Sequence, residues 1–334
     1  MNIRIFRDRK AALINSTVML VTACGWLGSF ALMAAGNVFL NIIGVLLCAQ
    51  TMVWAAYLIH EAAHQALFAG PRLNLVAGET ANFIAGSSYA SFERIRQMHI
   101  RHHVERADHV SFDFREFIVR RPVLRRFLEV MEWAYVPATE ALMHLQVVWR
   151  PLLVKSQRRD LPRAMSVLVV RLALLALLGL WSLKALLLYF VAYGVLMHVL
   201  NFFDCFQHTF ESFVVAPGSA PPPRIHHDRA YEQANTYSDL VSVRWPWLNA
   251  LALNFPYHNA HHHRASLPWY QLPSLHRSMF PDGCANVLPA RVLLGSWHRN
   301  RVRRVTAADY GAPAPGKPID DFVGAHGVSF LTVI

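Results

Sequence analysis

The sequence predicts an all-α integral membrane protein with four transmembrane helices in two hairpins, interfacial helices, and a cytoplasmic cap rich in histidine. Three observations lead to this prediction. Hydrophobic residues make up 54% of the 334 residues and charged residues only 16%, which is too apolar for an ordinary soluble domain. The apolar residues gather in runs long enough to cross a bilayer. The 18 histidines include three dense clusters, and all three lie outside these runs.

Four apolar runs predict the two hairpins. The first pair is Ile14 to Ala35 and Val38 to Ile59, and the second pair is Ala164 to Trp181 and Leu183 to Phe203. Very short turns separate the members of each pair, so each pair should form a tight helical hairpin. A signal peptide has a shorter apolar region and a cleavage site, so the first run is expected to be a retained span.

The segments between the hairpins and after them are more polar. Residues 74 to 92 are apolar but contain many small and polar residues, which favours a helix that lies at the membrane interface or re-enters the membrane, rather than a full span. Residues 94 to 163 are basic and include an amphipathic run near 127 to 149. We expect one membrane domain over residues 1 to 305 and a loosely ordered tail, rich in Pro, Gly and Ala, over 306 to 334.

The distribution of Lys and Arg predicts the orientation. Lys184 is the only basic residue near an outer turn, so the helix ends, residues 94 to 163 and the chain after residue 204 should be cytoplasmic. Within the third span, Arg171 is expected to extend its charge toward the interface. The net charge of +11 suits anionic lipid, an acidic protein or a phosphate-bearing substrate.

The three histidine clusters have the spacing of helical metal ligands. "HEAAH" supplies His60 and His64, which stand on one helix face. This motif alone also matches the HExxH pattern of zinc proteases, with Glu61 as general base. Two further clusters follow the spacing i, i+3, i+4, and each should converge on one face if helical: "HIRHH" with His99, His102 and His103, and "HNAHH" with His258, His261 and His262.

Eight histidines are more than one ion accepts, since first-row metals bound by imidazole take about four to six ligands. Two metal ions are therefore expected, and the scattered cysteines, which form no CxxC pair, leave nitrogen and oxygen as their ligands. Asp204 and His208 stand four apart at the end of the fourth span and are further candidates. Asp204 could bind directly, bind through water or orient another ligand.

Other residues near these clusters are assigned lesser roles. Asp108 could hydrogen-bond a ligand ring, and His109 should lie near the site without binding metal. His263 should point away from its cluster. The pair His226 and His227 lies in a loop, and the isolated His144, His276, His298 and His326 are expected at the surface.

Taken together, "HEAAH", "HIRHH" and "HNAHHHRASLPWYQLP", with hydrophobic hairpins between them, resemble the three histidine boxes of the membrane fatty acid desaturase superfamily. The resemblance covers about residues 38 to 280 and includes "NTYSDL" upstream of the third box. It implies two non-heme irons that activate O2, bound by the residues of the boxes. Asp204 and His208 match by position a pair that adds ligands in that family, although Asp replaces a neutral amide.

The implied activity is O2-dependent desaturation of the alkyl chain of a lipid or acyl thioester. Hydroxylation, carotenoid ketolation and decarboxylation to a terminal alkene are alternatives on the same scaffold. The chain has no heme, flavin or iron–sulfur motif, so an external donor such as a ferredoxin, a rubredoxin or a cytochrome is expected. The basic runs 120 to 127 and 299 to 304 suit an acidic donor or anionic lipid. No nucleic acid partner is expected, and an intramembrane zinc protease or a metal transporter fits the histidine pattern less well.

Overall fold

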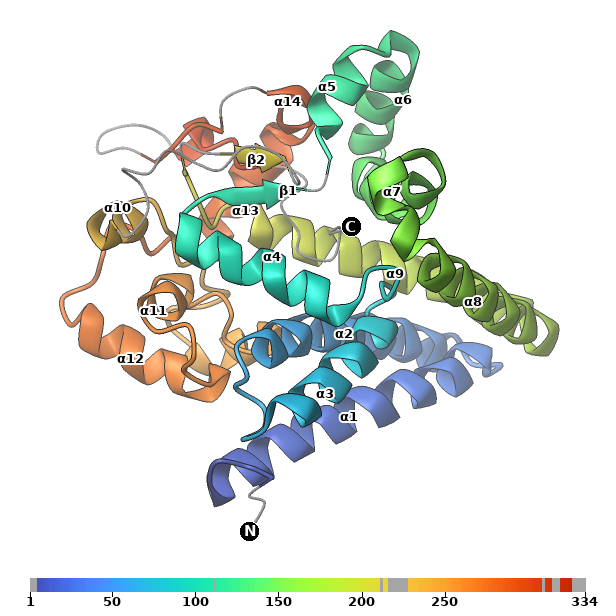
Figure 1. Cartoon of the computed structure of the whole chain (residues 1–334), viewed down its shortest axis with the longest axis horizontal. Helices are drawn as coiled ribbons and strands as arrows, with labels where there is room; N and C mark the ends of the chain where they lie inside the picture. The colour runs from blue at the N-terminus through green and yellow to red at the C-terminus, as the bar shows by residue number, and fades with distance from the viewer. Residues whose placement is uncertain are drawn as a thin grey trace. The chain divides into compact units, whose positions relative to one another are not determined.

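The computed structural model describes residues 5–110, 112–210, 213–215, 228–307, 310–313 and 319–325, and these are mostly helical (Figure 1). The chain divides into two compact units. The first unit comprises Met1–Arg96 and His144–Val199, and the second comprises Gln97–Met143 and Leu200–Val333. Three helices, α4 (Phe92–Glu105), α7 (Ala138–Leu153) and α9 (Leu183–Asp204), pass from one unit into the other.

The first unit contains the apolar helices. Besides parts of α4, α7 and α9, it consists of α1 (Arg9–Ala34), α2 (Val38–Ala63), α3 (Pro71–Ile84), η1 (Lys155–Asp160) and α8 (Leu161–Trp181). Within the described residues, four helical segments are long and apolar enough to cross a membrane: α1, α2, α9 and the segment Gln157–Trp181, which contains α8. The four predicted spans are therefore confirmed as helices of sufficient length and hydropathy.

Helices α1 and α2 pack along each other (Figure 1). Asparagine side chains close the turn between them. Asn37 begins α2 by accepting a hydrogen bond from the backbone N–H of Phe39 at 2.8 Å. The Asn41 amide donates to the carbonyls of Leu32, Met33 and Ala35, which end α1, at 2.9, 3.0 and 2.9 Å. Gly44 lets the helices approach, since a Cβ there would lie 2.8 Å from the Met33 nitrogen.

Helices α8 and α9 are joined through Ser182 but do not pack along each other in the described part of the chain. The apolar side chains of α8 face outward, and Leu177 and Leu180 are 62% and 85% exposed. Such exposure is typical of a helix surrounded by lipid. A packed second hairpin is therefore not confirmed.

Arg171 on α8 has partners at the end of another helix. Its guanidinium donates to the carbonyls of Phe83 and Ser87, at 2.8 and 3.0 Å, at the C-terminal end of α3. The last carbonyls of a helix lack partners within the helix, so they offer the half-buried arginine strong acceptors. Arg171 therefore supplies a donor at the end of α3, and its extension toward the interface stays a prediction.

The second unit is built from short helices. Its elements are β1 (Asp108–Val110), α5 (Phe114–Val119), α6 (Pro122–Trp133), β2 (Phe213–Val215), α10 (Arg229–Ala234), η2 (Pro246–Ala252), α11 (His258–His263), η3 (Trp269–Gln271), α12 (Leu272–Met279), α13 (Ala290–Arg299), α14 (Arg301–Thr306) and η4 (Ile319–Asp321). Strands β1 and β2 pair in parallel, with Asp108 opposite Phe213. One core cluster, of Leu240, Tyr257, Ala260, Leu267 and Leu272, packs α11 against α12.

Part of the predicted tail packs against the second unit. Phe322 is fully buried, with its ring 5.2 Å from that of Phe206 and 5.3 Å from that of Tyr237. Arg304 donates to the Val323 carbonyl at 2.7 Å. Other parts of the tail, and the loop with His226 and His227, lie outside the described residues. The domain boundary at residue 305 stays a prediction.

Candidate metal centre

In the first unit, α2 presents His60 and His64 at its C-terminal end, as their spacing predicts. Their ring centroids are 4.8 Å apart, and both residues are buried. Glu61 is also buried, and its Oε1 lies 3.4 Å from His60 Nδ1. The carboxylate therefore stands at the ring nitrogen that carries no ligand when Nε2 binds a metal.

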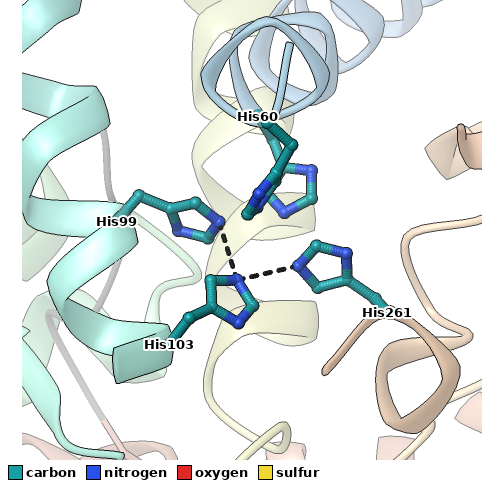
Figure 2. Close-up of side chains that lie close together, drawn as sticks. His60, His99, His103 and His261 are labelled. Atoms are coloured by element: carbon teal, nitrogen blue, oxygen red, sulfur yellow. Dashed lines mark hydrogen bonds between the residues drawn. The ribbon is translucent and has the colours of Figure 1, made fainter. Parts of the chain in front are cut away.

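In the second unit, three rings meet in a group that we call the three-histidine group: His99, His103 and His261. The Nε2 atom of His103 lies 3.1 Å from Nε2 of His99 and 3.0 Å from Nε2 of His261. Figure 2 shows these three rings, from α4 and α11, pointing toward one another. They bring the second and third histidine clusters together.

Four further rings of the second unit form what we call the four-histidine cluster: His102, His208, His258 and His262. One ring nitrogen from each lies within 4.8 Å of the others. The Nε2 atom of His258 is 2.8 Å from that of His208 and 3.1 Å from that of His262. The Nε2 atoms of His102 and His262 are 3.4 Å apart. His208, which follows the end of α9, thus joins the same cluster as rings from α4 and α11.

Each HxxHH motif is divided between the two groups, so the expectation that each converges on one face is wrong. On α4, His99 and His103 face the three-histidine group while His102 faces the four-histidine cluster. On α11, His258 and His262 face the four-histidine cluster. Neighbouring helical residues point about 100° apart, whereas residues four apart differ by only about 40°. The i, i+4 pair therefore shares one target, and the third histidine is directed to another.

Hydrogen bonds on the outer side of three rings define their tautomers. His102 donates Nδ1–H to the Ala107 carbonyl at 2.9 Å, and His262 donates Nδ1–H to Glu232 Oε1 at 2.9 Å. The Thr236 hydroxyl donates to the Glu232 carbonyl at 2.6 Å, so its oxygen can only accept from His208 Nδ1, 3.4 Å away. A ring that is protonated at Nδ1 carries a lone pair on Nε2. These lone pairs face one another inside the cluster.

Lone pairs that face one another repel unless a cation lies between them. The distances between the nitrogens of the cluster fit a bound metal ion. Imidazole nitrogens bind divalent first-row metals at about 2.1 Å, which places neighbouring ligand nitrogens about 3.0–3.4 Å apart. The measured separations of 2.8, 3.1 and 3.4 Å lie in or close to that range. Burial also lowers the pKa of His208 well below its usual value, and lowers the pKa of His262. A lowered pKa favours the neutral form of these two rings, and metal ligands must be neutral.

The two aspartates near the cluster have different surroundings. Asp204 lines a cavity of about 50 Å³ with His102, His208 and His258, but it is not among the four clustered ligands. Asp108 lines the same cavity, and its Oδ1 lies 3.6 Å from His102 Nδ1. That distance is too long for a hydrogen bond, and Ala107 accepts the proton instead. Burial raises the pKa of Asp108 to about 7.

Of the histidines expected at the surface, His298 is exposed, His144 is instead half-buried with its Nδ1 2.8 Å from the Tyr193 hydroxyl, and His326 lies outside the described residues. His263 is exposed and His109, 3.0 Å from Glu105, lines the cavity. His276, expected at the surface, is instead buried against Tyr257, with ring centroids 5.0 Å apart. It follows the apolar Leu272 on α12 by four residues and so shares its inward face.

Sequence reasoning missed Glu232 on α10. Its carboxylate is buried between His262 and Arg106, and it forms a further group with His103 and His262. The signal was present in "YEQANTYSDL", where an acidic residue precedes the segment that resembles the desaturase family.

A helical protein with four membrane-length apolar helices and buried groups of converging imidazoles belongs to the class of histidine-rich membrane proteins suited to metal binding. A comparison with protein families specifies the class further: the fatty acid desaturase family model matches residues 35–291. The chain therefore belongs to the fatty acid desaturase family. No curated protein matches it significantly.

Proposed function

We propose that this chain is an O2-dependent diiron oxidoreductase that desaturates the alkyl chain of a fatty acyl substrate. Membership of the desaturase family supports an oxidoreductase. The observation that carries the proposal is the four-histidine cluster, which gathers imidazoles from three separate segments around one point. Imidazole suits iron, and no cysteine belongs to the cluster.

The proposal assigns the ligands to two irons. One iron takes the four-histidine cluster, with Asp204 bound directly or through water. The other takes the three-histidine group of His99, His103 and His261. We add His60 and His64 to this second set because of their i, i+4 spacing and because the first box belongs to the family pattern.

When bound, the iron pair and O2 supply the oxidising power that no side chain has, which is needed to break an unactivated C–H bond. The chain itself fixes the orientation of three ligand rings, those of His102, His262 and His208, through Ala107, Glu232 and Thr236. The buried side chains of Met98 and Phe255 line the cavity beside the rings and limit the access of water.

An external electron carrier is part of the proposal. Desaturation removes two hydrogens from the substrate, and O2 becomes two waters only if two further electrons and two protons arrive. Of the two basic runs, the one at 299–304 is only partly available, because Arg301 and Arg304 are buried and only Arg299 and Arg303 are exposed. Helix α14, which carries Arg303, packs on α6, which carries residues 122–127 of the other basic run. We propose this basic surface for an acidic ferredoxin, rubredoxin or cytochrome, on the cytoplasmic side of the membrane.

The test combines metal and product analysis. The protein is expressed in a host of defined lipid composition and purified in detergent, and the proposal expects two irons per chain together with unsaturated acyl products by mass spectrometry. Hydroxylated, ketolated or terminal-alkene products would keep the diiron assignment and change the reaction. One zinc per chain with peptidase activity that depends on Glu61 would overturn the proposal.

A further inference from the structure

Three buried charged or polar side chains form a continuous line that ends at the four-histidine cluster. Arg106 Nη2 lies 3.2 Å from Glu232 Oε2, and the other carboxylate oxygen of Glu232 accepts from His262 Nδ1 at 2.9 Å. Arg106, Glu232 and His262 are 8%, 4% and 7% exposed. Burying a carboxylate is costly unless it is paired and hydrogen-bonded, and here both conditions hold.

The line connects the three helices around the cluster. Arg106 follows α4, which carries His102, and it ends that helix with a left-handed backbone at φ 49°, a conformation unusual for arginine. Its N–H donates to the His102 carbonyl at 3.0 Å. Glu232 belongs to α10, and His262 belongs to α11. The Arg106 side chain therefore begins one turn from one ring of the cluster and, through Glu232, acts on another.

The same segment also supports His208. Thr236, four residues after Glu232, donates to the Glu232 carbonyl and presents its oxygen to His208 Nδ1. Asn259 on α11 donates to the Thr236 carbonyl at 2.7 Å, which ties the segment to the helix of His258 and His262. Residues 232–236 thus contact the outer side of two of the four rings.

We infer that Glu232 is a positioning residue of the four-histidine cluster: its carboxylate, held by Arg106, orients His262 and keeps the proton of that ring on Nδ1. Glu232 meets the ring at the nitrogen that faces away from the cluster, so it acts through His262. A carboxylate in this place strengthens the imidazole as a donor, and losing such a partner typically weakens metal binding about 10–100-fold. The inference rests on the proposed function in taking the cluster as a metal site.

The test is a metal titration of purified protein that was first stripped with a chelator. Co²⁺ serves as the probe because its visible absorption reports histidine coordination, and Fe²⁺ per chain is measured in parallel. Glu232→Leu removes the acceptor and should weaken one of two bound ions about 10–100-fold and the other by a smaller factor. Glu232→Gln keeps an oxygen that can accept from His262, so it should bind that ion more tightly than Glu232→Leu.

The matched control is Glu105→Gln on α4. Glu105 also pairs with an arginine and a histidine, Arg101 at 2.8 Å and His109 at 3.0 Å, but neither belongs to the cluster. Both ions should bind this variant as they bind the wild type. The unfolding temperature of each metal-free variant separates positioning from a general loss of structure.

Three results would count against the inference. Wild-type affinity for both ions in Glu232→Leu would overturn it. Equal loss of both ions in Glu232→Leu and Glu232→Gln, with a lower unfolding temperature for the metal-free protein, would show a purely structural role. If His102→Ala bound the same ions as the wild type, the four-histidine cluster would not be a metal site. The proposed function would then fail, and the role of Glu232 would fail with it.

Discussion

His102 and His103 are neighbours in the sequence, yet their rings belong to different groups. His102 Nε2 lies 3.4 Å from His262 Nε2, whereas His103 Nε2 lies 3.0 Å from His261 Nε2. One helix, α4, therefore contributes to both candidate metal positions.

Replacing these two neighbours one at a time should remove different ions. His102→Ala should lower the occupancy of the four-histidine cluster, and His103→Ala that of the three-histidine group, because no nearby ring replaces either nitrogen. Each variant should keep about one iron per chain and less than about 1% of wild-type activity. Iron analysis with Mössbauer spectroscopy checks this, since the remaining iron should have a different spectrum in each variant. Identical residual spectra would contradict the division.

Loss of a first-box ring should abolish activity without preventing membrane insertion. His60→Ala removes a nitrogen that we assign to the second iron, and His261→Ala should behave in the same way. Membrane fractionation and product analysis measure the two effects separately. Near-normal turnover and iron content in either variant would exclude that residue from the site.

Glu61 separates an oxidase mechanism from a hydrolase mechanism. In the proposed diiron enzyme Glu61 only supports His60, 3.4 Å away, so Glu61→Gln should cause a partial loss, about 10-fold. A zinc hydrolase would need Glu61 as its base. Complete loss of activity with all metal retained would favour hydrolysis.

Asp204 and His208 should differ in their effect on metal content. His208→Ala removes a clustered nitrogen and should lower iron per chain. Asp204→Asn should be milder, because the amide oxygen can keep a weak bond or a hydrogen bond while one negative charge is lost. Iron analysis of both purified variants tests this order. Unchanged iron in His208→Ala would mean that another residue completes the cluster.

Stability should fall as the pH rises from about 5 to about 8, because of two buried glutamates in the second unit. Burial raises the pKa of Glu132 to about 7 and that of Glu140 to about 8. A carboxyl group whose folded pKa is raised stabilises the fold only while protonated, so this contribution is complete below the unfolded value and is lost as the pH passes the folded value.

Thermal unfolding of the detergent-solubilised protein between these pH values measures the effect. Glu132→Gln should reduce the pH dependence by at least about 2 °C. Glu129→Gln, in which an exposed ion pair with Arg125 is lost, should not reduce it. A parallel decline in wild type and Glu132→Gln would contradict the assignment.

The helices and the histidine boxes could be predicted because they follow local rules. The composition of a run such as Val38 to Ile59 predicts a helix without reference to the rest of the chain. The spacing of His258 and His262 likewise predicts that both lie on one helical face. The 100° step between His102 and His103 also implies that the two rings point in different directions. Only the structure shows which partners each ring meets.

The contacts of the supporting residues could not be predicted, because their partners are distant in the sequence. Glu232 lies 30 positions from His262, and Arg171 lies 88 positions from Phe83. Polar side chains at such positions look like ordinary surface residues until the fold shows which donor or carbonyl they meet. The burial of Arg301 and Arg304 could not be predicted for the same reason, because the local sequence there is typical of an exposed basic surface.

Because α4 contributes rings to both the three-histidine group and the four-histidine cluster, metal binding at one should affect metal binding at the other. An α-helix is stiff about its axis, so an ion bound by His99 and His103 fixes the rotation of α4 and thereby aims His102 at its own partners. Helix α11 imposes the same constraint through His261 on one side and His258 with His262 on the other. The first ion to bind therefore removes much of the ordering entropy that the second would otherwise have to overcome, and the two ions should load cooperatively.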